Sequence, residues 1–138
     1  MTLITNKIDY QKLSRTSLNG KRVYQCPDGS AVASVTTILD STKDKTHLIE
    51  WRKRVGEQNA VRITKEASGI GTRMHKYIED YIANGKWNEP GSNPYAQQEF
   101  KMAQDVHENA LKDVNEIWGS EVGLYFPKIY AGTTDCVG

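Results

Sequence analysis

The fold prediction depends most on the stretch Gly119-Ser-Glu-Val-Gly-Leu-Tyr-Phe-Pro-Lys-Ile-Tyr-Ala-Gly-Thr-Thr-Asp-Cys-Val-Gly138. Within it, two short apolar runs, Val122–Phe126 and Ile129–Ala131, flank the pair Pro127-Lys128. Apolar runs of this length on either side of a turn-forming pair are typical of a β-hairpin. We therefore expect this stretch to form two antiparallel strands.

Each predicted strand has one acidic residue near an end, Glu121 on the first and Asp135 on the second. Antiparallel pairing brings the start of one strand and the end of the next to the same edge of the sheet. Mg²⁺ prefers oxygen ligands and is usually held by one or two carboxylates together with water and phosphate. The pair therefore predicts a metal site. In the alternative interpretation, Asp135 ends its strand in an Asx-type turn and Glu121 is a solvated residue at a strand start.

Length and composition predict about one domain with a modest hydrophobic core. The 18 basic residues nearly balance the 17 acidic ones, so net charge gives no indication of a nucleic-acid partner. Cys26 and Cys136 lie far apart and match no Cys-x-x-Cys pattern, which favours reduced thiols in the cytoplasm. The N-terminus has neither a long apolar core nor a cleavage-like site, so we expect a protein that is not secreted and not bound to a membrane.

Residues 1–33 are expected to form a β-rich segment. Lys21–Cys26 alternates polar and apolar residues between turn signals, and we expect it to pair with Ala31–Ala33. Residues 1–19 show no regular pattern. Ser34 or Thr36 is expected to cap the helix that follows.

A helix is predicted from a cap at Thr46 to about Lys65, and its polar side is basic. The basic side chains are Arg52, Lys53, Arg54, Arg62 and Lys65. A basic face of this kind can lie along phosphates through a salt-dependent attraction. In the alternative interpretation the face is only solvated, because several glutamates dilute its charge.

Gly69 and Gly71 are expected to end this helix, and Thr72 to cap the next one, which ends at Asn84-Gly85. His75 and Glu79 are four residues apart and therefore share one face near the start of that helix. His75 is either a hydrogen-bonded packing residue or a metal ligand.

A long amphipathic helix is predicted from Pro94 to Trp118, with Asn93 as its N-cap. His107 falls on or near the apolar side of this helix. We therefore expect His107 to be a packing residue.

Taken in order, several motifs of the chain resemble the PD-(D/E)xK nuclease superfamily. The similarity is to the branch of phage and mitochondrial genome maintenance exonucleases, which is related to the RecB-type nucleases. The motifs lie between residues 34 and 138 and are Ser34-Val35-Thr36, Trp51, Gly71-Thr72-x-x-His75, Glu121 and Gly132-x-x-Asp135. The ordered set is far more specific than any one of its members.

The resemblance implies an α/β fold with a restriction-endonuclease-like core, in which a helical part precedes a hairpin that begins a mixed sheet. Residues 34–138 would form part of the nuclease domain. The resemblance also implies hydrolysis of DNA phosphodiesters with Mg²⁺ or Mn²⁺, exonucleolytic and on single-stranded ends, in a phage or bacterial host cell. The implied catalytic and metal-binding residues are His75, Glu121 and Asp135. The residues expected to contact DNA are Arg52, Lys53, Arg62, Thr72 and Arg73.

The sequence departs from the family pattern after Asp135, because the strand that carries Asp/Glu-x-Lys has no counterpart. We therefore expect this polypeptide to be weakly active or inactive alone. An open strand edge would also favour self-association. Some RecB-type nucleases hold an iron–sulfur cluster with four cysteines; we expect no such cluster here. Two rival interpretations are a non-catalytic DNA-binding or nuclease-accessory module and a purely structural partner protein.

Overall fold

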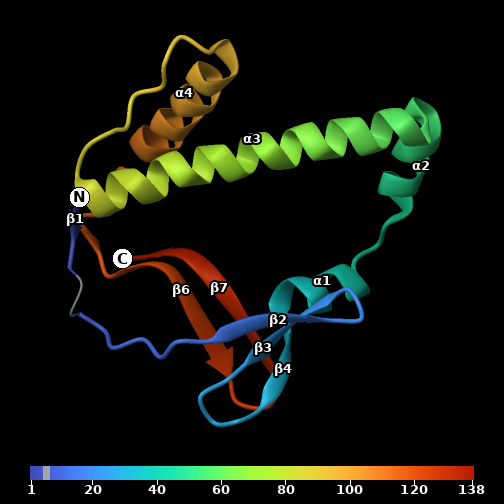
Figure 1. Cartoon of the computed structure of the whole chain (residues 1–138), viewed down its shortest axis with the longest axis horizontal. Helices are drawn as coiled ribbons and strands as arrows, with labels where there is room; N and C mark the ends of the chain where they lie inside the picture. Colours follow the sequence, from blue (N-terminus) through green and yellow to red (C-terminus); the bar gives the residue numbers. More distant parts are fainter. Residues whose placement is uncertain (5–6) are drawn as a thin grey trace. The chain divides into compact units, whose positions relative to one another are not determined.

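The computed structural model of the chain describes residues 1–4 and 7–138 and has mixed α/β structure. The chain divides into two compact units (Figure 1). The helical unit comprises Met1–Leu3 and Lys45–Glu116, and the sheet unit comprises Ile4–Asp44 and Ile117–Gly138. The predicted α/β class is therefore confirmed, whereas the restriction-endonuclease-like core and the division at residue 33 stay predictions.

The sheet unit contains a five-stranded sheet in the order β2-β3-β4-β7-β6. The strand bounds are β2 Ser14–Leu18, β3 Lys21–Gln25, β4 Ala31–Ser34, β6 Gly119–Phe126 and β7 Tyr130–Val137. All neighbours are antiparallel except β4 and β7, which pair in parallel through Ala33 with Tyr130 and Ser34 with Ala131. The sheet is therefore mixed, and it joins the N-terminal strands to the C-terminal hairpin.

Both predicted hairpins of this sheet are confirmed. β3 pairs with β4 through Val23 and Ala33, and β6 pairs with β7 from Gly119–Val137 to Phe126–Tyr130. β2 lies in a segment where no pattern was evident. β2 forms because Asn19 and Gly20 both take positive φ, which closes a tight turn and returns β3 alongside β2.

The core of the sheet unit is small. Tyr24, Cys26, Val32 and Ala131 are buried together, and Leu13 and Tyr125 pack against them. The Tyr24 hydroxyl is 3.0 Å from the Thr133 hydroxyl and hydrogen-bonds with it, which ties β3 to the hairpin. Burial of apolar surface and this buried polar contact therefore hold the hairpin on the sheet.

Helix α1, Val35–Thr42, leaves the end of β4. The Ser34 hydroxyl accepts a hydrogen bond of 3.0 Å from the amide of Thr37, as an N-cap residue does. The prediction that Ser34 or Thr36 caps this helix is confirmed for Ser34.

The helical unit contains α2 Thr46–Val55, α3 Glu57–Asn84 and α4 Pro94–Asn109. α4 packs against α3. Aromatic contacts join these helices: Tyr81 on α3 stacks on Trp87 and meets the edge of His107 on α4. His107 is thus a packing residue, as predicted. Short strands β1, Thr2–Leu3, and β5, Glu116–Ile117, pair with each other.

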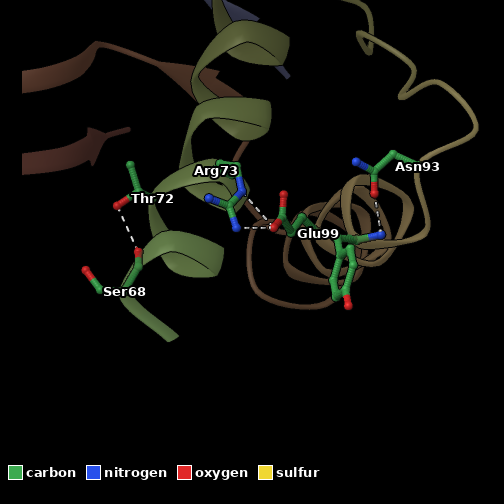
Figure 2. Close-up of polar contacts among 6 residues, drawn as sticks. Ser68, Thr72, Arg73, Asn93 and Glu99 are labelled. Carbon is green, nitrogen blue, oxygen red and sulfur yellow. Dashed lines mark hydrogen bonds and ion pairs between the residues drawn. The ribbon is translucent and has the colours of Figure 1, made fainter. Parts of the chain in front are cut away.

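The predicted break at Gly69 and Gly71 is wrong. α3 runs unbroken through both glycines (Figure 1), and the break lies instead at Gly56, with φ 85° and ψ 148°. A glycine inside a helix costs about 1 kcal/mol relative to alanine, which lowers helix stability without ending the helix. Thr72 is therefore an interior residue whose hydroxyl donates to the Ser68 carbonyl at 2.9 Å (Figure 2).

Two further helix boundaries differ from the prediction. Lys45, not Thr46, is the N-cap of α2, and the Lys45 side chain makes no capping hydrogen bond. The helix predicted to reach Trp118 ends at Asn109, because the chain turns and enters β5, where Ile117 is fully buried. The start of α4 is as predicted: the Asn93 side chain accepts from the Tyr95 amide at 2.9 Å. No helix among residues 1–4 and 7–138 is long and apolar enough to cross a membrane.

Candidate functional site

The hairpin of β6 and β7 carries two of the three predicted metal ligands. Ser120 pairs with Cys136 and Val122 pairs with Thr134, so position 121 lies opposite position 135. The structure therefore places Glu121 and Asp135 as cross-strand neighbours, and both residues are exposed. Their role in metal binding stays a prediction.

Glu121 has an unusual backbone for a strand residue. Its φ is 53°, in the left-handed region that residues other than glycine rarely adopt. Backbone strain of this kind costs about 1–3 kcal/mol and is concentrated at functional sites. Lys128 in the turn of the hairpin also has a positive φ, of 65°, but Glu121 takes this conformation inside a strand, which makes it a candidate functional position.

The chemistry of the two acids suits a cation. Mg²⁺ prefers oxygen ligands, and one or two carboxylates with water are enough to hold it. The acid pair thus fits a hard divalent ion chemically.

Asp135 also acts on its neighbour Cys136. Partial burial raises the pKa of the Cys136 thiol, and the nearby carboxylate of Asp135 raises it further. Both effects disfavour the thiolate. Cys26 and Cys136 are not joined to each other by a disulfide.

Two buried hydroxyls in the sheet unit, those of Tyr10 and Ser120, were not indicated by the sequence. The side-chain oxygens of Tyr10 and Ser120 are buried and have no hydrogen-bond partner among the described residues. The Tyr10 ring lies against Gly119, where an added Cβ would come within 2.9 Å of it. Buried polar groups in proteins are nearly always hydrogen-bonded, so these two hydroxyls are unusual. Ser120 directly precedes Glu121 in β6. No sequence pattern distinguishes the two hydroxyls.

His75 belongs to the helical unit, where it is an exposed residue well inside α3. The prediction that His75 lies near the start of a helix is wrong, because α3 begins at Glu57. Its helical neighbour Glu79 lies 3.8 Å from the Lys76 ammonium, which also contacts Asp80 at 2.8 Å. These acids raise the pKa of Lys76, mainly through the hydrogen bond with Asp80. The meeting of His75 with Glu121 and Asp135 stays a prediction.

Among residues 1–4 and 7–138, no three histidine, cysteine, aspartate or glutamate side chains are arranged to hold a metal ion. The candidate centre on the hairpin is therefore the two-acid pair. Its completion by His75 is a separate hypothesis.

The residues expected to contact DNA are mostly engaged with acids. Arg52 pairs with Glu57, and Arg62 pairs with Glu66 at 3.2 Å. Lys53 is exposed. These partners reduce the positive potential of the basic face, as the alternative interpretation anticipated.

Arg73 has a different environment, because its partner Glu99 is buried (Figure 2). The Arg73 guanidinium lies 2.7 Å from a Glu99 oxygen, and the Glu99 side chain is only 3% exposed. The hydrogen bond with Glu99 raises the pKa of Arg73. The pair joins α3 to α4 beside a cleft of about 330 Å³. A signal for Glu99 was present in the sequence, since it lies four residues before Ala103 on the apolar side of α4.

Comparisons of the chain with known protein families, with characterised proteins and with solved structures found no match. The nuclease resemblance is therefore carried by the residues of this chain alone.

Proposed function

We propose that this chain belongs to a divalent-metal-dependent deoxyribonuclease of the PD-(D/E)xK type that acts on DNA ends. The observation that carries the proposal is the position of Glu121, in a strained left-handed conformation, opposite Asp135 on the hairpin. The order of the sequence motifs supports it, and so does the mixed sheet that holds the hairpin.

The proposed roles follow from the chemistry of the side chains. Asp135 lies in the regular strand β7 and is the principal ligand of Mg²⁺ or Mn²⁺. Glu121 is a second ligand or orients a water molecule. In the nuclease resemblance His75 is also a metal ligand, and this role stays a prediction. The ion would lower the pKa of a bound water and polarise the scissile phosphate.

Metal binding is the first test, because it reads out the acid pair without requiring turnover. Titration of the protein with Mn²⁺, followed by the electron paramagnetic resonance of the free ion, measures the affinity directly. We expect Asp135→Asn and Glu121→Gln each to weaken binding by at least about tenfold, since even residues outside the ligand set of a metal site are worth that much. Asp9→Asn is the matched control, because Asp9 is an exposed acid of the same unit.

Equal Mn²⁺ affinity in Asp135→Asn, Glu121→Gln and Asp9→Asn would remove the basis of the proposal. Release of nucleotides from end-labelled DNA, measured with Mg²⁺ and with EDTA, then tests hydrolysis. Salt-sensitive DNA binding that survives Asp135→Asn and His75→Ala, without Mn²⁺ binding, would favour the non-catalytic DNA-binding module instead.

Glu121→Gly separates strain from function. Glycine adopts a φ of 53° without strain, so this variant should be more stable than Glu121→Gln by about 1 kcal/mol. It should nevertheless lose Mn²⁺ affinity as Glu121→Gln does. Urea unfolding measures the first effect, and the same Mn²⁺ titration measures the second. A Glu121→Gly protein less stable than Glu121→Gln would show that the left-handed backbone is not strained.

A further inference from the structure

Two exposed aromatic rings stand at the tip of the hairpin. Phe126 ends β6 and Tyr130 begins β7, and their ring centroids are 5.9 Å apart with planes inclined by only 26°. Phe126 is 54% exposed and Tyr130 is 42% exposed. Large aromatic side chains normally bury much of their surface, so an exposed stacked pair suits a flat aromatic ligand.

The pair borders a groove within the sheet unit. The groove has a volume of about 390 Å³ and is lined by residues that include Val35, Leu124, Phe126, Tyr130, Thr133 and Thr134. No charged side chain lines it among the described residues. Apolar walls with a few hydroxyls are typical of sites for small organic groups, and the volume lies within the usual range for such sites.

The turn that joins the two rings carries a positive charge. Lys128 is an exposed residue of the turn between Phe126 and Tyr130. Its charge also acts on Asp28, whose pKa is lowered mainly by hydrogen bonds with Ser30 and further by Lys128. A nucleotide combines a flat apolar base with an anionic phosphate, so two aromatic rings joined by a turn with an ammonium group suit both parts. Base stacking on aromatic side chains is tolerant of sequence, because every base has a π face.

We propose that the hairpin groove, formed by these residues, is a stacking platform for unpaired bases of a DNA single strand. The inference rests on the proposed function, in which DNA is the substrate, and it specifies single-stranded ends as the form that is bound. Phe126 and Tyr130 stack on the bases, and Lys128 contacts the backbone phosphate.

The position of the platform relative to the acids explains why a single strand is required. Tyr130 and Asp135 are five residues apart on β7, so they face opposite sides of the sheet and are separated by roughly 17 Å at about 3.3 Å per residue. DNA bound at both places must pass around β6, which is an edge strand. A flexible single strand can turn in this way, whereas duplex DNA has a persistence length of about 50 nm and cannot.

The test measures the binding of a short fluorescein-labelled oligo(dT) by anisotropy in EDTA, so that metal plays no part. We expect Phe126→Ala and Tyr130→Ala each to weaken binding roughly 5- to 140-fold, which corresponds to about 1–3 kcal/mol per stacked base. Tyr130→Phe keeps the ring and should bind as the unaltered protein does. Leu18→Ala is the matched control, because Leu18 is an exposed apolar residue of the same sheet, 63% exposed on β2.

Two further ligands identify what the groove recognises. An abasic oligonucleotide of equal length keeps the phosphates but lacks the bases, and it should bind much more weakly than oligo(dT). Duplex DNA should also bind more weakly. Unchanged oligo(dT) affinity in Phe126→Ala and Tyr130→Ala, or equal affinity for the abasic strand, would overturn the platform. The platform would also be overturned if the unaltered protein were a dimer that binds no oligo(dT) and that dissociates in Phe126→Ala. The groove would then be a contact between two copies of the chain.

The platform and the metal site can fail separately. Asp135→Asn should keep its oligo(dT) affinity in EDTA, since the platform needs no metal. If Asp135→Asn and Glu121→Gln bind Mn²⁺ as Asp9→Asn does, while oligo(dT) binding depends on Phe126 and Tyr130, the metal site alone is refuted. Mn²⁺ binding together with oligo(dT) binding that is insensitive to Phe126→Ala and Tyr130→Ala refutes the platform alone.

Discussion

The location of the helix break can be tested with two glycine-to-alanine substitutions that should act in opposite directions. Gly71 lies inside α3, and a Cβ added there would meet no atom within 4 Å. Gly56 separates α2 from α3 and has φ 85° and ψ 148°. We expect Gly71→Ala to stabilise the protein and Gly56→Ala to destabilise it.

The magnitudes follow from the two backbones. Alanine at an open helical position gains about 0.5–1 kcal/mol over glycine, because it restricts the unfolded chain and favours helix. Alanine at Gly56 must adopt a conformation that is almost reserved for glycine, at a cost of about 1–3 kcal/mol. The two variants should therefore differ by about 1.5–4 kcal/mol in unfolding free energy. At a urea dependence of about 1–3 kcal/mol per molar, Gly71→Ala alone should raise the midpoint by roughly 0.2–1 M.

Urea unfolding followed by circular dichroism measures the midpoints, and amide hydrogen exchange localises the effect. In a continuous α3, the amides from Thr72 to His75 are hydrogen-bonded within the helix and exchange slowly. If a new helix began at Thr72, its first amides would have no helical partner and would exchange quickly. A lower midpoint for Gly71→Ala together with fast exchange at these amides would refute the continuous helix.

Two ion pairs give further predictions. Arg73→Met should lower the urea midpoint clearly more than Arg62→Met. Arg73→Met leaves the buried carboxylate of Glu99 without its partner, whereas the ion pair of Arg62 with Glu66 is solvated. Equal midpoints for the two variants would contradict this reasoning. The hydrogen bond with Arg52 lowers the pKa of Glu57 below 4.5, so the stability that this pair contributes is present above that pH and is lost as the pH falls towards the lowered pKa. Stability measured between about pH 5 and 3 should therefore fall less in Glu57→Gln than in the unaltered protein, and parallel pH profiles would show that the pair contributes nothing.

Features that depend on a few neighbouring residues could be predicted from the sequence. The caps at Ser34 and Asn93 follow from side chains that reach an amide two or three residues away. The hairpin follows from the two apolar runs that flank Pro127-Lys128. β7 extends to Val137, beyond the predicted apolar run, because threonine and cysteine at its end pair with β6 although they are not strongly apolar.

Features that depend on distant residues could not be predicted. The parallel pairing of β4 with β7 joins segments about a hundred residues apart, and no local pattern encodes it. The helical spacing of Glu99 and Ala103 could indicate that Glu99 faces inward, but not that Arg73 of the neighbouring helix is its partner. The error at Gly69 and Gly71 has another cause: a glycine ends a helix only where its backbone takes a left-handed or extended form, and composition does not reveal which glycine does so. Gly56 and Gly85 do so here.

The hypothesis that His75 shares a cation with Glu121 and Asp135 joins residues of two different units, and a direct test exists. Bound Mn²⁺ is paramagnetic and broadens the nuclear resonances of nearby groups. The chain has three histidines, His47, His75 and His107, so their imidazole signals can be assigned by substitution.

If the imidazole of His75 is a ligand, Mn²⁺ broadens the His75 signals first, and Asp135→Asn abolishes the effect. His107 packs between aromatic rings and serves as the internal control. If the hairpin acids respond to Mn²⁺ while His75 stays sharp, the cation is held by the two carboxylates without the imidazole. The proposed metal site would then be confined to the sheet unit, and the helical unit would contribute to DNA binding or to stability but not to the metal.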